Sequence, residues 1–474
     1  MKYIKLTIAL NMLCLFCACE DFISLDSPVE QLDTRKVYST DQTALAAING
    51  LYAKLSNGVG FASGYFNSVT LFAGRSADDF VNLSTNEEKK QFSENNLSAR
   101  NQGLRSGLWQ EPYQIIYAAN MVIENLSQAE QLNPILKKQL EGEAKFIRAF
   151  CHFYLVNLFG EIPLILTTDY KINLKAGRSG RQVIYEQIIK DLIEAKALLN
   201  NDYPVSERIR ANKWAASALL SRVYLYHHNW YAAEQEASLI IAQQRIYSLE
   251  NDLDRVFLNE SKEAILQFAL PSLYPHSTNE GLLYIIDAPP TSESEVMLSK
   301  ELLDAFESGD KRNANWVGTL TSGTTSWHYP FKYKIKSGAA VLNEYSMVIR
   351  LAELYLIRAE ARINQNKIEE GIADINLLRT RARPLPTADI PNPIPALTFR
   401  LSKTEALFAV EKERRTELFA EWGHRWLDLK RTRRAEILLS VTKPIYWQPT
   451  DTLYPIPESE LLNAPNLYQN NGYQ

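Results

Sequence analysis

Cysteine is scarce in this chain, and most of it stands at one end. Cys14, Cys17 and Cys19 lie near the N-terminus, and Cys151 is the only cysteine in the rest of the 474 residues. A single cysteine cannot form an internal disulfide. Cys151 falls on the apolar side of a helical pattern, where a cysteine is usually a small buried hydrophobic group rather than a nucleophile.

The chain also lacks a surplus of positive charge. Its 51 lysines and arginines face 55 aspartates and glutamates, and the net charge is -4. Because binding to phosphates needs a strong basic surplus, nucleic acid is excluded as a partner. The densest basic run, residues 430–434, follows a helical pattern and predicts a solvated helix end, where cations complement the helix dipole.

Signatures of catalysis and of metal binding are missing as well. The sequence has no His-Glu-x-x-His and no Gly-x-Ser-x-Gly, and the glycines at Gly58 and Gly60 are not continued as a phosphate loop requires. His227 and His228 are adjacent, so on a helix they diverge and cannot easily share a metal. Neither catalytic residues, nor a cofactor, nor metal ligands are predicted.

A long apolar run occurs at the N-terminus. Residues 6 to 16 follow a basic start and are too short for the roughly 20 residues of a membrane-spanning helix. With the small residue Ala18 before Cys19, they predict a secretory signal over residues 1–18 and lipid attachment at Cys19. The alternative is an ordinary secretory peptide, because Phe16 stands where leucine is usual before a lipidated cysteine.

Apolar residues recur at helical spacing along most of the chain. Single helices are predicted over 41–55, 109–126, 144–158, with Gly160 as its end, and 184–199. The segments 212–242 and 347–382 have the pattern of tetratricopeptide-like helix pairs. The predicted fold is therefore mainly α, with such pairs stacked into a right-handed scaffold over about 40–245 and 345–440.

Between these helical parts the composition changes. Residues 250–344 are rich in glycine, proline, serine and aromatic residues, with short strand-like runs at 264–269 and 282–286. Five prolines at 384–395 predict an extended connector. Because binding residues usually lie on loops held by a rigid scaffold, we expect the ligand-binding region at 250–344 together with the loop 57–108.

Several short motifs occur in a fixed order along the chain. They are FGEIPL (159–164), RLAELYLIRAEA (350–361), ERRTEL (413–418), RWLDLK (425–430), YPIPESE (454–460) and QNNGY (469–473). In this order they make the chain resemble the SusD/RagB family of outer-membrane lipoproteins over nearly its whole length. Glu20-Asp21, directly after Cys19, resembles the acidic signal for export to the cell surface.

The resemblance implies a fold, a location and a partner. Family members have a helical fold with tetratricopeptide-like pairs, lie at the cell surface and work with a SusC-like TonB-dependent outer-membrane channel. They capture oligosaccharides, or in some cases peptides, and are not enzymes. The resemblance thus implies a single SusD-like domain over residues 19–474.

The charged motifs also have a purely structural interpretation. The charges within 413–417 predict helix-stabilising pairs worth a few tenths of a kcal/mol each. The segment 425–428 is expected to fix the last helix to the scaffold, and Arg350 with Glu353 to act in the same way.

Two loops carry the combination of aromatic and polar residues that sugars need, since sugars present apolar faces edged by hydroxyl groups. The predicted ligand-binding residues are Trp316, Trp327 and Tyr329 in one loop and Tyr65, Phe66, Asn67, Arg75, Asp78 and Asp79 in the other. The alternative is that these aromatic residues close the loops onto the scaffold.

These observations predict a non-catalytic lipoprotein of the outer membrane, exposed at the cell surface, that captures glycan and passes it to a SusC-like channel. Two alternatives stay open. One has the same architecture with a peptide as ligand, which a deep groove with polar groups reaching the backbone would favour. The other is a glycan-degrading surface enzyme, for which the pair Asp78 and Asp79 is only weak evidence among 55 acidic residues.

Overall fold

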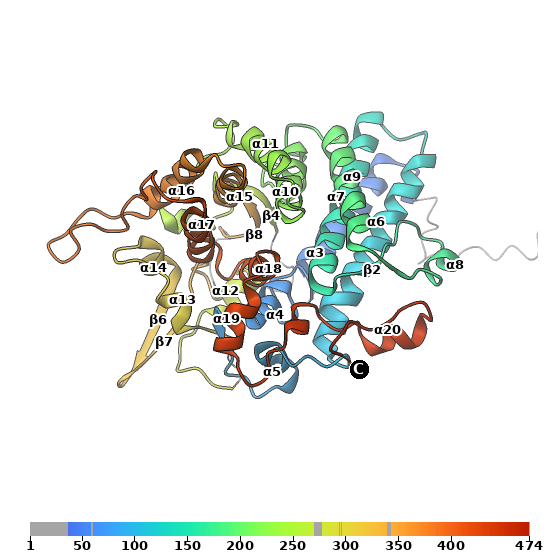
Figure 1. Cartoon of the computed structure of the whole chain (residues 1–474). Helices are drawn as coiled ribbons and strands as arrows, with labels where there is room; N and C mark the ends of the chain where they lie inside the picture. The colour runs from blue at the N-terminus through green and yellow to red at the C-terminus, as the bar shows by residue number, and fades with distance from the viewer. Residues whose placement is uncertain are drawn as a thin grey trace, which may run out of the picture.

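The computed structural model describes residues 37–57, 60–269, 277–292, 294, 296–338 and 343–473. The predicted signal peptide and Cys19 lie outside the described residues. Helices make up most of the fold and the strands are short, which confirms the mainly α class (Figure 1). Within the described ranges, no helix is both long enough and apolar enough to cross a membrane.

Four helices form the right-hand half of Figure 1: α3 (Asp41–Asn57), α6 (Glu111–Gln128), α7 (Pro134–Phe159) and α9 (Arg181–Leu198). All four predicted single helices are confirmed. The longest, α7, starts where the side chain of Asn133 accepts from the N–H groups of Ile135 and Leu136. It ends at Gly160, whose φ of 78° suits a residue without a Cβ. Cys151 is buried within this helix.

The two predicted helix pairs are also present, and they stack on each other. The first consists of α10 (Lys213–Tyr226) and α11 (Trp230–Ile241), and the second of α15 (Leu351–Asn364) and α16 (Ile368–Ala382). Helix α15 packs against α11 of the first pair and against α17 (Lys403–Leu418). The second pair is shorter than predicted, because residues 346–350 form a buried strand instead of the first turn of a helix.

Among the described residues there are four small antiparallel sheets, three of them in or beside the loop-rich parts and one between α7 and α9. They pair β1 (Phe80–Val81) with β5 (Met297–Leu298), β2 (Ile162–Pro163) with β3 (Arg178–Ser179), β4 (Ala264–Phe268) with β8 (Ser346–Arg350), and β6 (Val317–Ser322) with β7 (Thr325–Pro330). Strand β4 confirms the run predicted at 264–269. The strand predicted at 282–286 is wrong: α12 (Asn279–Tyr284) occupies this place, and Thr278 caps it by accepting from the Gly281 N–H.

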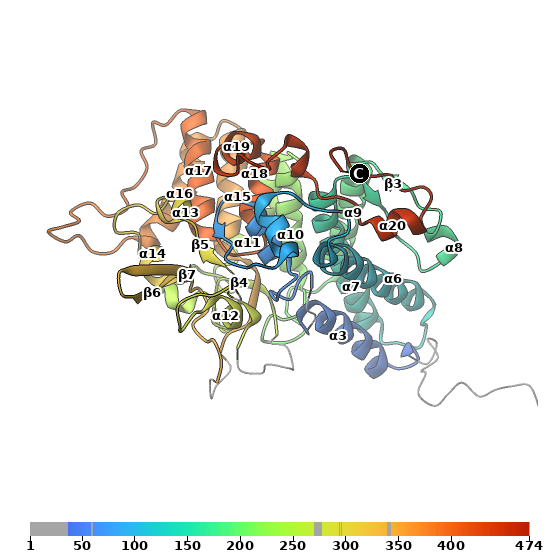
Figure 2. The ribbon, with the colours of Figure 1, turned by 90° about the horizontal axis from the view of Figure 1, so that it is seen from below.

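Shorter elements complete the fold. They are α4 (Val69–Ser76), α5 (Glu87–Glu94), a π-helical segment (Leu104–Gln110), α8 (Tyr170–Asn173), α13 (Lys300–Leu303), α14 (Lys311–Trp316), α18 (His424–Arg431), α19 (Ala435–Thr442), α20 (Glu458–Asn463) and two 3₁₀ turns (Leu253–Arg255 and Pro449–Thr452). Residues 383–402 contain neither helix nor strand, as the prolines predict, and project from the body in Figures 1 and 2.

A buried ionic cluster joins α17 to the rest of the molecule. Its centre is Glu417, whose Oε1 accepts from Arg350 Nη1 at 2.6 Å and from Arg381 Nη2, and whose Oε2 accepts from Arg312 Nη1 at 3.0 Å. Burial alone would raise the pKa of Glu417, but the three arginines outweigh it and hold this pKa well below its usual range. The arginines lie on β8, α16 and α14, so one carboxylate connects four elements.

This cluster corrects the structural interpretation of three motifs. Glu413 and Glu417 bind arginines of other elements in the interior, so the charges of 413–417 are not surface pairs within one helix. Arg350 and Glu353 do not pair with each other; Arg350 binds Glu417, and Glu353 binds Arg222. Within the run 430–434, Lys430 and Arg431 pack into the structure instead of being solvated.

The segment 425–428 does fix helix α18 to the scaffold. Arg425 Nε and Nη2 donate to the two carboxylate oxygens of Asp78, at 2.7 and 2.9 Å. Asp428 Oδ2 accepts from Arg414 Nε of α17 at 2.7 Å. The motif RWLDLK therefore joins α18 both to the residues after α4 and to α17.

We expect Glu417→Gln to destabilise the protein by about 3–5 kcal/mol, because three buried guanidinium groups would lose their shared negative partner. Urea unfolding followed by circular dichroism measures this change. The matched control is Glu458→Gln, which breaks the exposed pair with Arg100 and should leave the unfolding midpoint almost unchanged. Equal midpoints for the two variants would contradict a central role of Glu417.

Candidate functional site

The hairpin β6–β7 presents one aromatic face. Its strands meet in a two-residue turn at Gly323, whose φ is 61°, and their register sets Trp327 opposite Leu320 and Tyr329 opposite Gly318. Because side chains alternate along a strand, Trp327 and Tyr329 lie on the same side. His328 lies on the other side, where its Nδ1 is 3.0 Å from Thr319 Oγ1.

Gly318 allows the Tyr329 ring to lie across the neighbouring strand. A Cβ at this position would be 2.2 Å from the ring, so a side chain here would displace Tyr329. The ring of Phe331 follows, edge-on to Tyr329 with the centroids 5.8 Å apart. Trp327 is half-buried and Tyr329 is 9% exposed. The result is a row of three aromatic side chains from residues 327, 329 and 331.

Charged side chains surround this row. Lys336 Nζ is 2.8 Å from the carboxylate of Asp287, and Lys334 Nζ lies 4.2 Å from the centre of the Phe331 ring. Burial, and then the nearby negative charge of Asp287, raise the pKa of Tyr329. Flat apolar rings beside charged groups that can bind hydroxyls are the combination expected of a sugar-binding surface. The hairpin packs against α14 and β5, and Figure 1 shows it next to α14.

The second predicted loop carries its own aromatic pair. The rings of Tyr65 and Phe66 are 4.2 Å apart, and Lys89 Nζ of α5 lies 5.1 Å from the centre of the Phe66 ring. Both rings and the side chain of Asn67 are partly exposed. Asn67 packs against Gly107, where a Cβ would be 2.5 Å from the Asn67 carbonyl oxygen.

A half-buried and a buried glutamate, Glu111 and Glu280, hold the loop before this pair. Glu111 Oε2 accepts from the Phe61 N–H at 2.6 Å, and the Glu280 carboxylate lies under Gly64 and accepts from Ser346 Oγ at 2.5 Å. Burial raises the pKa of Glu111 to about 7, against the opposing effects of the Phe61 N–H and Lys54. Burial likewise raises the pKa of Glu280 to about 7.

Four predicted ligand-binding residues lie in the interior instead, which corrects the placement expected for them. Trp316 is fully buried, its Nε1 donates to Leu253 O at 3.0 Å, and Lys332 Nζ lies 4.8 Å from its ring. Arg75 is fully buried in α4, and Asp78 and Asp79 are buried as well. These side chains contact other parts of the protein. Loop composition alone does not show which side chains face inward, so the sequence could not predict this burial.

The two aspartates bind arginines of the C-terminal helices. Asp78 pairs with Arg425 and Arg415, and Asp79 Oδ1 accepts from Arg415 Nε at 2.9 Å. Burial would raise the pKa of Asp78, but its bonds to Arg425 and the charge of Arg415 lower it below the usual value. Both carboxylates therefore connect the segment after α4 to α17 and α18.

Sequence reasoning missed Gly318, Phe331, Asp287 and Lys336. A signal for part of this set was present: Trp327, Tyr329 and Phe331 alternate after a turn at Gly323, a period of two that indicates a strand of a hairpin. Asp287 and Lys336 carry no such signal, because only the folded chain brings them to the aromatic row.

Two family models match this chain. One, described as "Starch-binding associating with outer membrane", matches residues 32–225, and the other, described as "SusD family", matches residues 304–473. A SusD-like protein of Formosa agariphila is 26% identical over 96% of this chain and 97% of its own length. A SusD-like protein of Bacteroides ovatus is 24% identical over 80% of this chain and 76% of its own length.

The chain belongs to the SusD/RagB family. Solved structures agree in fold: a SusD superfamily protein of Bacteroides vulgatus superposes with a TM-score of 0.77 at 21% identity, over 92% of this chain and all of the other. A laminarin-binding SusD-like protein superposes with a TM-score of 0.72 at 24% identity, again over 92% of this chain and all of the other. The helical-repeat scaffold of this SusD/RagB protein is thus the fold of its superfamily.

We expect the stability of this SusD/RagB protein to fall between pH 5 and pH 8, partly through Glu111. A carboxyl with a pKa of about 7 when folded and 4.5 when unfolded stabilises the fold fully below pH 4.5, and this contribution is lost as the pH rises to about 7. The glutamine in Glu111→Gln does not titrate and still offers an uncharged acceptor to the Phe61 N–H. Between pH 5 and pH 8 the unfolding free energy of Glu111→Gln should therefore fall by about 2 kcal/mol less than that of the unchanged protein. Urea unfolding of both proteins at pH 5 and at pH 8 measures this difference. An equal fall in unfolding free energy for the two proteins would contradict the role of Glu111.

Proposed function

We propose that this SusD/RagB protein is a non-catalytic, cell-surface lipoprotein that captures glycan and delivers it to a SusC-like TonB-dependent channel of the outer membrane. The observation that carries the proposal is the aromatic row of the β6–β7 hairpin, with Trp327 half-buried and charged groups beside it. The family membership supports it, as does the laminarin-binding relative of the same fold.

The proposal includes an arrangement of the chain. Residues 1–18 are a signal peptide, Cys19 carries the lipid that anchors the protein in the outer membrane, and residues 19–474 form a single SusD-like domain. The helical parts at 40–245 and 345–440 act as the scaffold. The ligand-binding region comprises 250–344 and the loop 57–108.

Within this region we assign capture first to the half-buried Trp327, with Phe331 and the edge of the largely buried Tyr329 extending the row. A sugar ring placed against Trp327 would have Asp287 and Lys336 within the same rim to bind its hydroxyl groups. Tyr65, Phe66 and Asn67 form a second contact surface, held by Glu111 and Glu280.

A role without catalysis is supported by the fate of the acidic pair. Glycoside hydrolysis needs two carboxyl groups that face each other across the bond to be cleaved. Asp78 and Asp79 are instead buried and bound to Arg415 and Arg425. They are therefore engaged in holding helices together.

We expect Trp327→Ala to weaken glycan binding about tenfold or more, because a large aromatic side chain in a contact surface supplies a large part of the binding energy. Residues 20 to 474 would be titrated with a panel of polysaccharides, oligosaccharides and peptides by isothermal titration calorimetry. His328→Ala is the matched control, since it removes the neighbouring ring on the opposite side of the same strand.

Three results would decide between the alternatives. Loss of binding to one glycan class in Trp327→Ala but not in His328→Ala supports capture at the hairpin. Binding of peptides alone would keep the architecture and replace the ligand. Release of shortened sugars from a bound glycan after long incubation would instead support a surface enzyme.

A further inference from the structure

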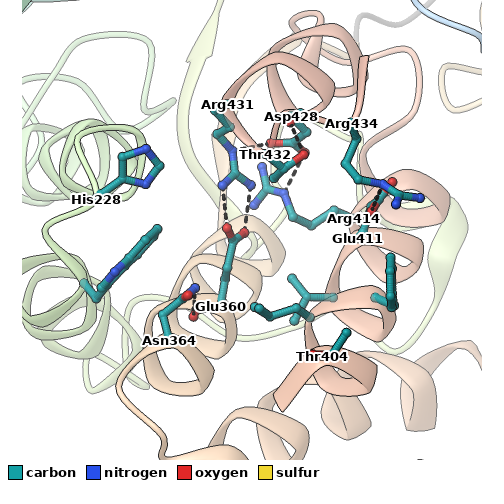
Figure 3. Close-up of a pocket in the computed structure, with 14 residues that line it drawn as sticks. His228, Glu360, Asn364, Thr404, Glu411, Arg414, Asp428, Arg431, Thr432 and Arg434 are labelled. Atoms are coloured by element: carbon teal, nitrogen blue, oxygen red, sulfur yellow. Dashed lines mark hydrogen bonds and ion pairs between the residues drawn. The ribbon is translucent and has the colours of Figure 1, made fainter. Parts of the chain in front are cut away.

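A second concave site lies away from the hairpin, among α11, α15, α17 and α18. The pocket has a volume of about 350 Å³, near the lower end of the range of about 300–1,000 Å³ that small-molecule sites occupy. None of its lining residues belongs to the hairpin or to the loop 57–108. Figure 3 shows His228 on one side and the charged groups of α15, α17 and α18 on the other.

Two aromatic side chains contribute apolar surface to this pocket. Trp230 begins α11 and contacts His228 edge-on, with the ring centroids 5.0 Å apart. Phe408 comes from α17 and is 49% exposed. A flat ring entering the pocket would therefore meet apolar surface from two different helices.

All three carboxylates that line the pocket are already bound by arginines. Glu360 binds Arg431, Asp428 binds Arg414 and Arg431, and Glu411 Oε2 is 3.3 Å from Arg434 Nε. Figure 3 shows Glu360, Arg431, Asp428 and Arg414 as one connected group, with the pair of Glu411 and Arg434 beside it. A ligand would thus find few acidic oxygens free to accept from it.

Donors, in contrast, are left over. Arg414 is 2% exposed, and its Nη1 and Nη2 have no hydrogen-bond partner in the part of the chain that the structure describes. Among the described residues, Arg434 forms an ion pair through Nε with Glu411, and its guanidinium lies 5.0 Å from the centre of the Phe408 ring. Spare guanidinium donors are best satisfied by a carboxylate.

Neutral polar groups complete the lining. Asn364 donates through Nδ2 to Glu360 O, and its Oδ1 has no donor among the described residues. Thr404, which also lines the pocket, is exposed. An amide oxygen and a hydroxyl are suited to the hydroxyl groups of a sugar. An aromatic acid without hydroxyl groups would leave them unused.

We propose that this pocket binds a sugar acid of one ring, with the ring against Trp230 and Phe408 and the carboxylate toward the guanidinium groups of Arg434 and Arg414. The site is independent of the proposed capture surface. It gives this protein a second specificity, for a small acidic sugar at the scaffold rather than for a glycan chain at the loops.

The test compares sodium glucuronate with glucose, which has a CH₂OH group where glucuronate has the carboxylate. Both would be titrated into residues 20 to 474 by ligand-observed NMR, with benzoate as a ring acid that lacks hydroxyl groups. We expect glucuronate to bind at least about tenfold more tightly than glucose or benzoate, the effect of one charge-assisted contact. Arg434→Gln should weaken glucuronate about tenfold, whereas Arg433→Gln, the same change at a neighbour outside this pocket, should not.

Several outcomes would overturn the proposal: equal affinity for glucuronate and glucose, tighter binding of benzoate, identical effects of the two arginine variants, or no binding of glucuronate up to roughly 10 mM. If Arg434→Gln does not fold, the exposed wall is tested by Phe408→Ala, which should weaken glucuronate binding. Trp327→Ala should leave glucuronate binding unchanged, so a failure here is distinguishable from a failure of glycan capture at the hairpin.

Discussion

The arrangement of this molecule depends on neutralising charge inside it. Glu417 is fully buried and binds Arg312, Arg350 and Arg381, and each of these arginines belongs to a different element. Removing such charges from water costs several kcal/mol per ion, and only good geometry with several partners offsets that cost. The elements must therefore dock in one relative position. Trp316 lies directly against this cluster and is followed at once by β6, so the cluster also determines where the aromatic hairpin leaves the body.

Helix α17, which carries Glu417, also holds the second aromatic loop, together with α18. Arg415 of α17 and Arg425 of α18 bind Asp78 and Asp79, which follow α4, and α4 in turn follows the loop that carries Tyr65 and Phe66. The two loop surfaces thus share one support, although they lie far apart in the sequence. The charged residues of these short motifs therefore form ion pairs inside the protein. The loop surfaces that a ligand could reach carry mainly aromatic rings.

Periodicity predicted the helical scaffold because it is a local property. Residues three or four apart on one face show a helix directly, and Gly160 marks the end of α7 by its own conformation. The ionic partners were not predictable in this way: Glu417 meets Arg350 across 67 residues, while the rule for helix pairs reaches only four. For the same reason Trp316 and Trp327, both aromatic and in one loop-rich segment, could not be told apart. Their burial is decided by Lys332 and the arginine cluster in one case and by the strand register in the other.

The two arginine-rich regions of α17 differ in how completely they are satisfied. At Glu417 both carboxylate oxygens accept from arginines. At Arg414, one turn away, Asp428 accepts from Nε, yet the two Nη groups find no acceptor among the described residues. Buried donors without partners are rare, because each costs about 1–3 kcal/mol. A saturated cluster serves rigidity, whereas an unsaturated one beside an open pocket retains binding capacity. Within the motif ERRTEL of α17, Glu417 therefore builds the scaffold, whereas Arg414 keeps donors that a ligand could use.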